Sequence, residues 1–175
     1  SYTKNIILGG GCFCCTEAVF KQINGVLSVF PGYIGGNTDN PTYREICTGL
    51  TVHAEVIKVE YDSRVVSLKD VLMIFFSTHD PTTLNRQGND IGTQYRSSIF
   101  TSNLKEIKII NDYITELNQS NNYSSPVVTT IEKENIFYMA EDYHQNYFEM
   151  NQNAPYCSMV IKPKLNKFKK KTNLF

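Results

Sequence analysis

A turn between an expected strand and an expected helix, marked by glycine and cysteine, constrains this chain more than any other feature. Residues 9–11 are all glycine, and Cys12 follows them directly. Residues 2–8 end in three apolar side chains and predict a strand, whereas residues 16–23 carry apolar side chains at helical spacing. A thiolate at such a turn faces unpaired backbone N–H groups and the positive end of a helix dipole, which lower the pKa of the thiol. The pattern therefore indicates a nucleophilic cysteine.

The number and spacing of the cysteines favour redox or nucleophilic chemistry over structural disulfides. The chain has five cysteines, an odd number, and three of them fall within residues 12–15. That clustering is unlike the disulfide framework of a secreted protein. Cys12 and Cys15 form a C-x-x-C pair, which occurs in redox and metal sites, but the remaining cysteines and histidines lack the spacing of zinc ligands. We expect no metal ion and no cofactor.

Length and hydropathy bound the size and location of the protein. A chain of 175 residues suits one domain with a substantial core, so we expect a single domain over residues 1–175. No apolar run approaches the length of about 20 residues that is needed to cross a bilayer. The N-terminus also lacks a basic and then apolar signal. We therefore expect a soluble, cytoplasmic protein without membrane contact.

Glu55 is the second informative residue, because it shares one face of an expected strand with apolar side chains. Residues 54–61 alternate with a period of two, so that Glu55 lies on the same side as Ile57, Val59 and Tyr61. A carboxyl group at the edge of a core is desolvated, which raises its pKa and lets it donate a proton near neutral pH. The alternative is an ordinary solvated glutamate at the end of a strand.

Three further polar residues stand in segments without periodicity. Asp90 and Tyr95 fall in or directly after a long loop that the sequence predicts over residues 78–94. Tyr43 follows an Asn-Pro-Thr segment in another loop. Long loops in compact domains are often functional, and a tyrosine hydroxyl is suited to holding a polar ligand atom. Taken singly, each of these residues is more typical of ordinary loop structure than of a functional site.

The remaining pattern predicts strands that alternate with helices. Apolar periodicity predicts helices over residues 68–76 and 104–117, and Ser67 with Asp70 predicts a capping box before the first. The other expected elements are strands over residues 26–30, 96–101 and 127–131, a loop over residues 31–42 and a short helix over residues 140–150. Short connections and scattered loops favour an α+β fold over a parallel, doubly wound sheet.

The C-terminal tail concentrates positive charge. Residues 161–171 hold six of the 17 basic residues and no acidic one, so residues 1–160 carry 11 basic against 17 acidic residues, a net charge of −6. We expect the tail, about residues 151–175, to be irregular because it contains Pro155 and Pro163, and to pack against the acidic body. No aromatic ladder or recognition helix accompanies the lysines, so we expect no nucleic-acid partner.

Short motifs run in a fixed order along nearly the whole chain. They are Gly11-Cys12-Phe13, Gly32-Tyr33-Ile34-Gly35-Gly36, Asn40-Pro41-Thr42-Tyr43, His53-Ala54-Glu55, Thr78-His79-Asp80-Pro81, Arg86-Gln87-Gly88-Asn89-Asp90, Gly92-Thr93-Gln94-Tyr95-Arg96 and Ala140-Glu141-Asp142-Tyr143-His144-Gln145. In this order they resemble the peptide methionine sulfoxide reductase A family. The expected fold is an α+β two-layer sandwich, with a mixed, largely antiparallel sheet, a ferredoxin-like core and an irregular C-terminal tail.

The resemblance implies a thiol-dependent reduction of methionine S-sulfoxide, free or in proteins. Cys12 would attack the sulfoxide sulfur. Glu55 would bind and protonate the sulfoxide oxygen together with Tyr43 and Tyr95, and Asp90 would support that polar site. Methionine would then leave, and Cys12 would become a sulfenic acid. A second cysteine would condense with it, and thioredoxin would reduce the resulting disulfide.

The chain departs from the family at Cys14. The family usually has tryptophan at this position, where phenylalanine and the indole together hold the methyl group of the substrate. This chain has Phe13 but no tryptophan at all. A thiol in place of an indole removes much apolar contact, so Phe13 and Cys14 are the expected substrate contacts of a weakened methyl pocket.

The resemblance favours Cys157 as the resolving cysteine, because the family often has one in this C-terminal segment. Cys15 is the alternative, since it lies one helical turn from Cys12. A disulfide, however, needs Cβ atoms about 3.5 to 4.5 Å apart, closer than the roughly 5 to 6 Å between helical neighbours. Cys14 is less favoured where it occupies the methyl pocket.

A second function class remains open from the residues alone. A thioredoxin-like disulfide oxidoreductase would use Cys12 and Cys15 as its dithiol, but it leaves Glu55 without a role. The resemblance instead implies methionine sulfoxide as substrate and thioredoxin as reductant, and we expect a monomer.

Overall fold

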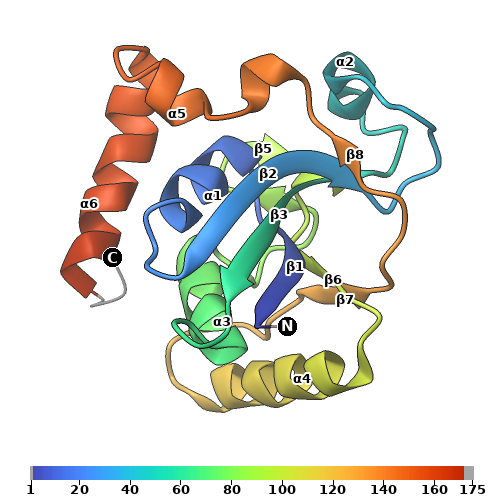
Figure 1. The fold of residues 1–175 in the computed structure, drawn as a ribbon. Coiled ribbons are helices and arrows are strands. Elements are labelled where there is room, and N and C mark those ends of the chain that lie inside the picture. The colour runs from blue at the N-terminus through green and yellow to red at the C-terminus, as the bar shows by residue number, and fades with distance from the viewer. Residues whose placement is uncertain (1, 172–175) are drawn as a thin grey trace.

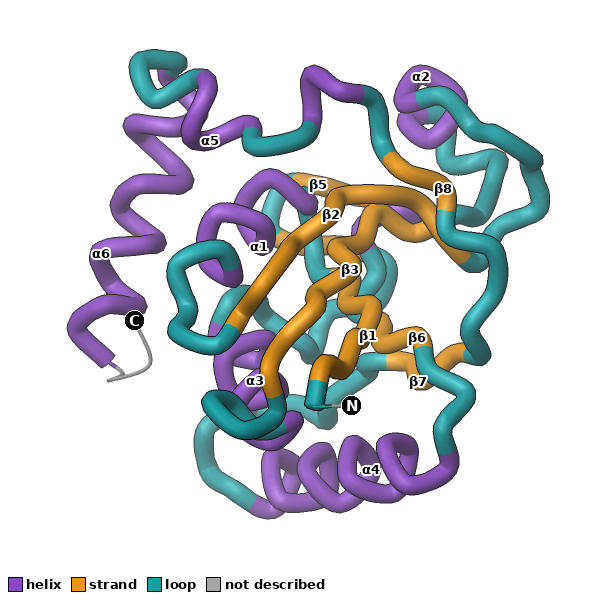
Figure 2. Tube along the Cα trace, viewed as in Figure 1, coloured by secondary structure: helices purple, strands orange, loops and turns teal. Residues whose placement is uncertain are grey.

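The computed structural model describes residues 2–171; Ser1 and residues 172–175, the two ends of the expected domain, lie outside the described residues. A six-stranded sheet forms the centre of the molecule and helices pack around it (Figure 1, Figure 2). Its strands, in spatial order, are β7 (Thr130–Glu132), β6 (Ser98–Phe100), β1 (Thr3–Gly9), β3 (Ala54–Asp62), β2 (Val26–Ile34) and β8 (Tyr138–Met139). A separate hairpin consists of β4 (Arg86–Gln87) and β5 (Asp90–Ile91).

Four strands and two helices form the expected ferredoxin-like core. In chain order these elements are β1, α1 (Phe13–Phe20), β2, β3, α3 (Leu68–Ser77) and β6, and neighbouring core strands are antiparallel. β7 extends the sheet beside β6 in the parallel direction. The predicted α+β class with a mixed, largely antiparallel sheet is therefore confirmed.

The two faces of β3 belong to two different packing layers, as its alternation predicts. Ile57 and Val59 are buried in the main core with side chains of α1 and α3. Ala54 and Val56 belong to a smaller cluster on the opposite face. Glu55 shares the parity of Ile57 and is only 1% exposed. The carboxyl group is thus at the edge of the main core, where the sequence predicts it.

Local capping explains where the helices begin. The hydroxyl of Ser67 accepts the N–H of Asp70, and the Asp70 carboxylate accepts the N–H of Ser67, which is the predicted capping box of α3. The predicted long helix is α4 (Leu104–Gln119), capped by Asn103. A shorter helix, α2 (Tyr43–Cys47), begins at Thr42, and η1 (Thr93–Tyr95) is a single 3-10 turn.

β2 is longer than expected, and the loop predicted over residues 31–42 is wrong for its first four residues. The strand continues through Pro31 and Gly32 to Ile34. Proline is tolerated because the backbone of Pro31 faces away from β3, and its carbonyl accepts the N–H of Ala140 on that outer side. No ladder hydrogen bond to β3 is therefore lost.

The C-terminal part also differs from the expected pattern. The helix predicted over residues 140–150 consists of two short pieces, η2 (Asp142–His144) and α5 (Tyr147–Met150). Asn146 separates them, because it adopts a left-handed conformation with a φ of 56°. No helix within residues 2–171 is long and apolar enough to cross a membrane.

The expectation of an irregular tail is not met by residues 157–171, which are helical. A π-helical turn, η3 (Cys157–Ile161), leads into α6 (Lys162–Lys171) along one side of the molecule (Figure 1). Pro163 lies directly after η3, so the N–H that proline lacks falls where the chain changes from the π-helical turn to α6. Ile161, Leu165 and Phe168 are buried at spacings of four and three residues and attach the helix to the main core. The lysines between them mask this apolar stripe in the sequence.

A buried carboxylate fastens α5 to α1. Glu17 on α1 is 1% exposed, and it accepts the backbone N–H of Asn146 at 3.0 Å and that of Tyr147 at 3.3 Å. Burial raises the pKa of Glu17, while these hydrogen bonds oppose the shift. The contact fixes the left-handed break between η2 and α5.

We expect Glu17→Ala to destabilise the protein by about 2 to 3 kcal/mol, because two partly buried N–H groups lose their acceptor. Glu149→Gln on the exposed side of α5 is the control and should change the free energy of unfolding by less than about 0.5 kcal/mol. Urea unfolding followed by circular dichroism measures both variants. If both variants had the same free energy of unfolding, the hydrogen bonds of Glu17 to Asn146 and Tyr147 would not stabilise the fold.

Candidate active site

The glycine turn presents Cys12 at the start of α1. Gly11 has a φ of +75°, which glycine adopts without steric strain, and a Cβ on Gly10 would lie 2.9 Å from the ring of His79. Cys12 then has extended backbone and is the N-cap residue of α1. Its predicted place at a strand-to-helix turn is confirmed.

The antiparallel register of β1 and β3 brings Glu55 beside this turn. Leu8 pairs with Ile57, so the end of β1 lies next to the beginning of β3. The N–H of Phe13 donates to Glu55 Oε1 at 3.4 Å. Glu55 Oε2 is buried and has no hydrogen-bond partner within the described part of the chain. Such an unpaired oxygen is unusual in a folded protein and is available to a ligand.

A cavity of about 280 Å³ opens beside Cys12. Its lining consists of Cys12, Cys14, Tyr43, Asp90, Tyr95, His144, Tyr147 and Tyr156. Five of the residues expected at the site therefore meet at one cavity, although they come from separate elements. Asp90 is exposed at the cavity, on β5. Phe13 does not line it; its buried ring packs against His144 with centroids 5.0 Å apart.

Of the two cysteines that line this cavity, Cys12 ionises and Cys14 stays protonated. A hydrogen bond from the Cys14 thiol lowers the pKa of Cys12 to about 7 against the opposing effect of burial, and the Cys14 N–H and the Tyr156 hydroxyl assist. The same contact with Cys12, together with burial, raises the pKa of Cys14. Cys12 is therefore the thiolate of the pair, and Cys14 is the thiol that donates to it.

A carboxyl group and two phenol groups near the thiolate are held in their protonated forms. Burial, followed by the charge of Cys12, raises the pKa of Glu55 well above its usual range. Burial also raises the pKa of Tyr43 and Tyr95, and the nearby Glu55 adds to both shifts. A carboxyl group and two phenol groups can thus donate hydrogen bonds close to the nucleophile.

Sequence reasoning gives no role to Glu141 and His144, which the structure places at the site. Glu141 accepts the N–H of Tyr43 at 2.8 Å and the hydroxyl of Tyr33 at 2.9 Å, which fixes the start of α2. The buried ring of His144 lies 4.4 Å from that of Tyr43, and its Nε2 has no partner among the described residues. Burial lowers the pKa of His144. The only sequence signal for both residues is the motif at residues 140–145.

The two expected resolving cysteines do not line the cavity. Cys15 is buried in α1, and its sulfur lies 3.2 Å from the hydroxyl of Tyr156. Cys157 is 0% exposed in η3, directly after Tyr156 in sequence. Burial raises the pKa of both thiols. All five cysteines are free thiols in this structure.

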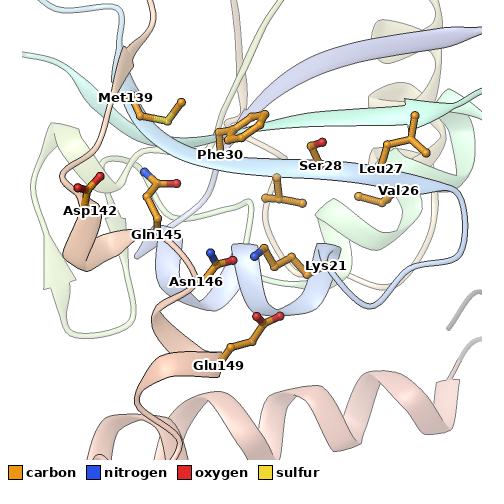
Figure 3. A pocket seen from close by; sticks show the side chains of 11 residues that line it. Lys21, Val26, Leu27, Ser28, Phe30, Met139, Asp142, Gln145, Asn146 and Glu149 are labelled. Atoms are coloured by element: carbon orange, nitrogen blue, oxygen red, sulfur yellow. The ribbon is translucent and has the colours of Figure 1, made fainter.

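A larger hollow, of about 580 Å³, lies along the outer edge of β2 and is separate from the cavity beside Cys12 (Figure 3). Its lining consists of Lys21, Val26, Leu27, Ser28, Val29, Phe30, Met139, Asp142, Gln145, Asn146 and Glu149. None of these residues is a cysteine or an expected site residue. The smaller cavity, which holds the nucleophile, is therefore the candidate active site.

The sequence and the fold both match known proteins. A family profile described as peptide methionine sulfoxide reductase matches residues 4–174. A protein of Polynucleobacter asymbioticus named peptide methionine sulfoxide reductase MsrA is 55% identical over 164 residues, which cover 94% of this chain and 86% of that protein.

Two solved structures of one yeast protein are also similar. The crystal structure of Mxr1 from Saccharomyces cerevisiae in reduced form has a TM-score of 0.82 and 36% identity, and covers 89% of this chain and 90% of its own. Mxr1 in complex with Trx2 has a TM-score of 0.59 and 26% identity, with coverage of 83% and 85%. Because the family profile spans both the turn that carries Cys12 and the strand that carries Glu55, the chain belongs to the peptide methionine sulfoxide reductase family.

Proposed function

We propose that the enzyme reduces methionine S-sulfoxide, free or in a polypeptide, by attack of the Cys12 thiolate on the sulfoxide sulfur. The observation that carries this proposal is a cysteine with a pKa of about 7 next to a buried carboxyl group, that of Glu55, with a raised pKa. Nucleophile and proton donor thus coexist in their reactive forms near neutral pH. Membership of the family supports the same reaction.

Glu55 supplies the proton that the sulfoxide oxygen needs. Its unpaired Oε2 is the available donor atom, and the hydroxyls of Tyr43 and Tyr95 add hydrogen bonds from the cavity wall. Protonation makes the sulfur more electrophilic and prevents the oxygen from leaving as a bare anion. The oxygen ends on Cys12 as a sulfenic acid, and methionine leaves as the thioether.

The other lining residues position the substrate. We assign the methyl group of the substrate to the side formed by Cys14 and by the ring of Phe13 behind the cavity wall, and we assign the support of the polar side to Asp90. Tyr147 and Tyr156 add aromatic surface on the side of α5 and η3. Such rings pack well against the flexible, polarisable side chain of methionine.

Recycling requires a second thiol and an external reductant. We assign the resolving role to Cys157, with Cys15 as the alternative, and the reductant role to a thioredoxin. The complex of the related Mxr1 with Trx2 supports this choice of reductant. Cys157 directly follows the cavity residue Tyr156, so unwinding of η3 would carry its thiol toward Cys12.

Residues 1–175 act as one catalytic domain and as a monomer in the cytoplasm. The five free thiols suit a reducing compartment, in which disulfides do not persist.

Separated methionine S- and R-sulfoxides, with dithiothreitol as reductant, test the reaction directly. We expect turnover of the S epimer only. Cys12→Ser should abolish it, because a serine hydroxyl is not ionised and is a weak nucleophile. Cys47→Ser, which removes an exposed thiol on α2, is the control and should still release methionine. Substantial turnover by Cys12→Ser would contradict the assignment.

Glu55→Gln should lower turnover by about 100-fold to 10,000-fold, because glutamine cannot transfer a proton. Glu60→Gln is the matched control, since Glu60 lies on the same strand but on the opposite face. Wild-type turnover should fall as pH rises through the raised pKa of Glu55, because the proton-donating form is lost. This falling limb should be missing from the pH profile of Glu55→Gln; near-normal kinetics in that variant would reduce Glu55 to a structural residue.

Cys157→Ser should release one methionine per enzyme and keep turning over with dithiothreitol, but lose cycling with thioredoxin. The reason is that oxidised Cys12 can no longer form a disulfide with Cys157, which is the bond that thioredoxin would reduce. Peptide mapping of the wild-type enzyme after one equivalent of substrate should show a Cys12–Cys157 bridge. A Cys12–Cys15 bridge, with Cys157→Ser still cycling on thioredoxin, would transfer the role to Cys15.

A further inference from the structure

Cys12 and Cys14 line the same cavity, and only one residue separates them at the start of α1. The lowered pKa of Cys12, which has the Cys14 thiol as its largest cause, agrees with this proximity. The other two buried thiols are held elsewhere: Cys15 is bonded to the hydroxyl of Tyr156, and Cys157 is fully buried in η3. A sulfenic acid on Cys12 therefore forms in a cavity that Cys14 also lines, whereas Cys15 and Cys157 are buried outside its lining.

We propose that Cys14 is the first resolving thiol, and that it condenses with the Cys12 sulfenic acid inside the cavity before Cys157 takes part. This inference rests on the proposed attack of Cys12 on the sulfoxide. The Cys14 sulfur attacks the Cys12 sulfur, an S–S bond forms, and the S–O bond of the sulfenic acid breaks. Cys14 is oxidised, the Cys12 sulfur is reduced, and the oxygen leaves as water with the proton of the Cys14 thiol. No external oxidant or reductant is needed.

Oxidation of Cys12 prepares Cys14 for this step. While Cys12 is a thiolate, its hydrogen bond and its charge keep Cys14 protonated, so Cys14 does not compete for the substrate. A sulfenic acid is neutral, and both effects disappear when it forms. Glu55, left as a carboxylate after the first step, lies close enough for its charge to act on Cys14 and can carry the proton to the departing oxygen.

The short loop between the two cysteines suits a transient product. Cys12 is the extended N-cap residue and Cys14 is the second residue of α1, so their disulfide closes a ring with one residue between them. Strained disulfides are more readily reduced, and they exchange with an incoming thiol. The bond would protect Cys12 from further oxidation and then pass to Cys157, which carries it to the reductant.

The wild-type enzyme gives the first test without any substitution. It is mixed with one equivalent of methionine sulfoxide in the absence of reductant, quenched in acid at successive times, alkylated and mapped by mass spectrometry. We expect a Cys12–Cys14 link that reaches its maximum before the Cys12–Cys157 link appears. A Cys12–Cys157 link at every time, with Cys14 alkylated throughout, would overturn the inference.

A second test isolates the two thiols in a chain that carries Cys15→Ser, Cys47→Ser and Cys157→Ser. After one equivalent of substrate, its mass should fall by two hydrogen atoms, and dimedone, which traps sulfenic acids, should not label it. Adding Cys14→Ser keeps a hydrogen-bond donor beside Cys12 but removes the second sulfur. Dimedone should then label Cys12, and the sulfenic acid should live about tenfold longer or more, because the intramolecular step is lost.

Methionine release distinguishes a failure of the Cys14 step from a failure of the proposed reduction. Equal dimedone labelling with and without Cys14, together with release of methionine, would overturn the inference and leave the proposed function standing. Absence of methionine release from the wild-type enzyme would overturn the proposed function, and the inference with it.

Discussion

The antiparallel pairing of β1 with β3 is the constraint on which the rest of the site depends. The end of β1 and the beginning of β3 lie side by side. Cys12 follows β1 after the glycine turn, and Glu55 is the second residue of β3. A slip of one residue in this register would move Glu55 to the opposite face, among Ala54 and Val56. The apolar pattern of the whole strand therefore holds the carboxyl group in place.

A second constraint is that the cavity favours a single negative charge. The thiolate of Cys12 carries it, and the pKa values of Cys14 and Glu55 are raised because both groups are buried and because the charge of Cys12 is close to them. Cys14 and Glu55 are consequently hydrogen-bond donors rather than competing anions. When the charge moves from sulfur to a carboxylate or disappears, the same neighbours change from donors to acceptors or nucleophiles. The protonation of Cys14 and Glu55 therefore depends on whether Cys12 is charged.

Local patterns in the sequence predict the features that local chemistry decides. Three such features depend only on residues nearby in the sequence. They are the strand-to-helix turn at Cys12, the face of β3 on which Glu55 lies and the capping box at Ser67. The resemblance to the family adds the residues that meet at the cavity. Features created by distant partners were not predictable: β2 passes through Pro31 because Ala140 bonds its outer side, and Glu141 gains its role from Tyr43. The helical tail was missed because three apolar residues are separated by lysines.

The attachment of α6 has a consequence for the timing of the catalytic cycle. The buried side chains of Ile161, Leu165 and Phe168 form a narrow apolar stripe that packs the end of η3 and α6 against the core, and Cys157 lies in the turn just before α6. On the proposed route, the population in which this segment has opened limits how often Cys157 can react. Each kcal/mol of packing at the stripe changes that population about fivefold. Tighter packing at the stripe shields the Cys157 thiol from oxidants but slows turnover. The same three side chains therefore affect both the rate of repair and the resistance of the enzyme to oxidation.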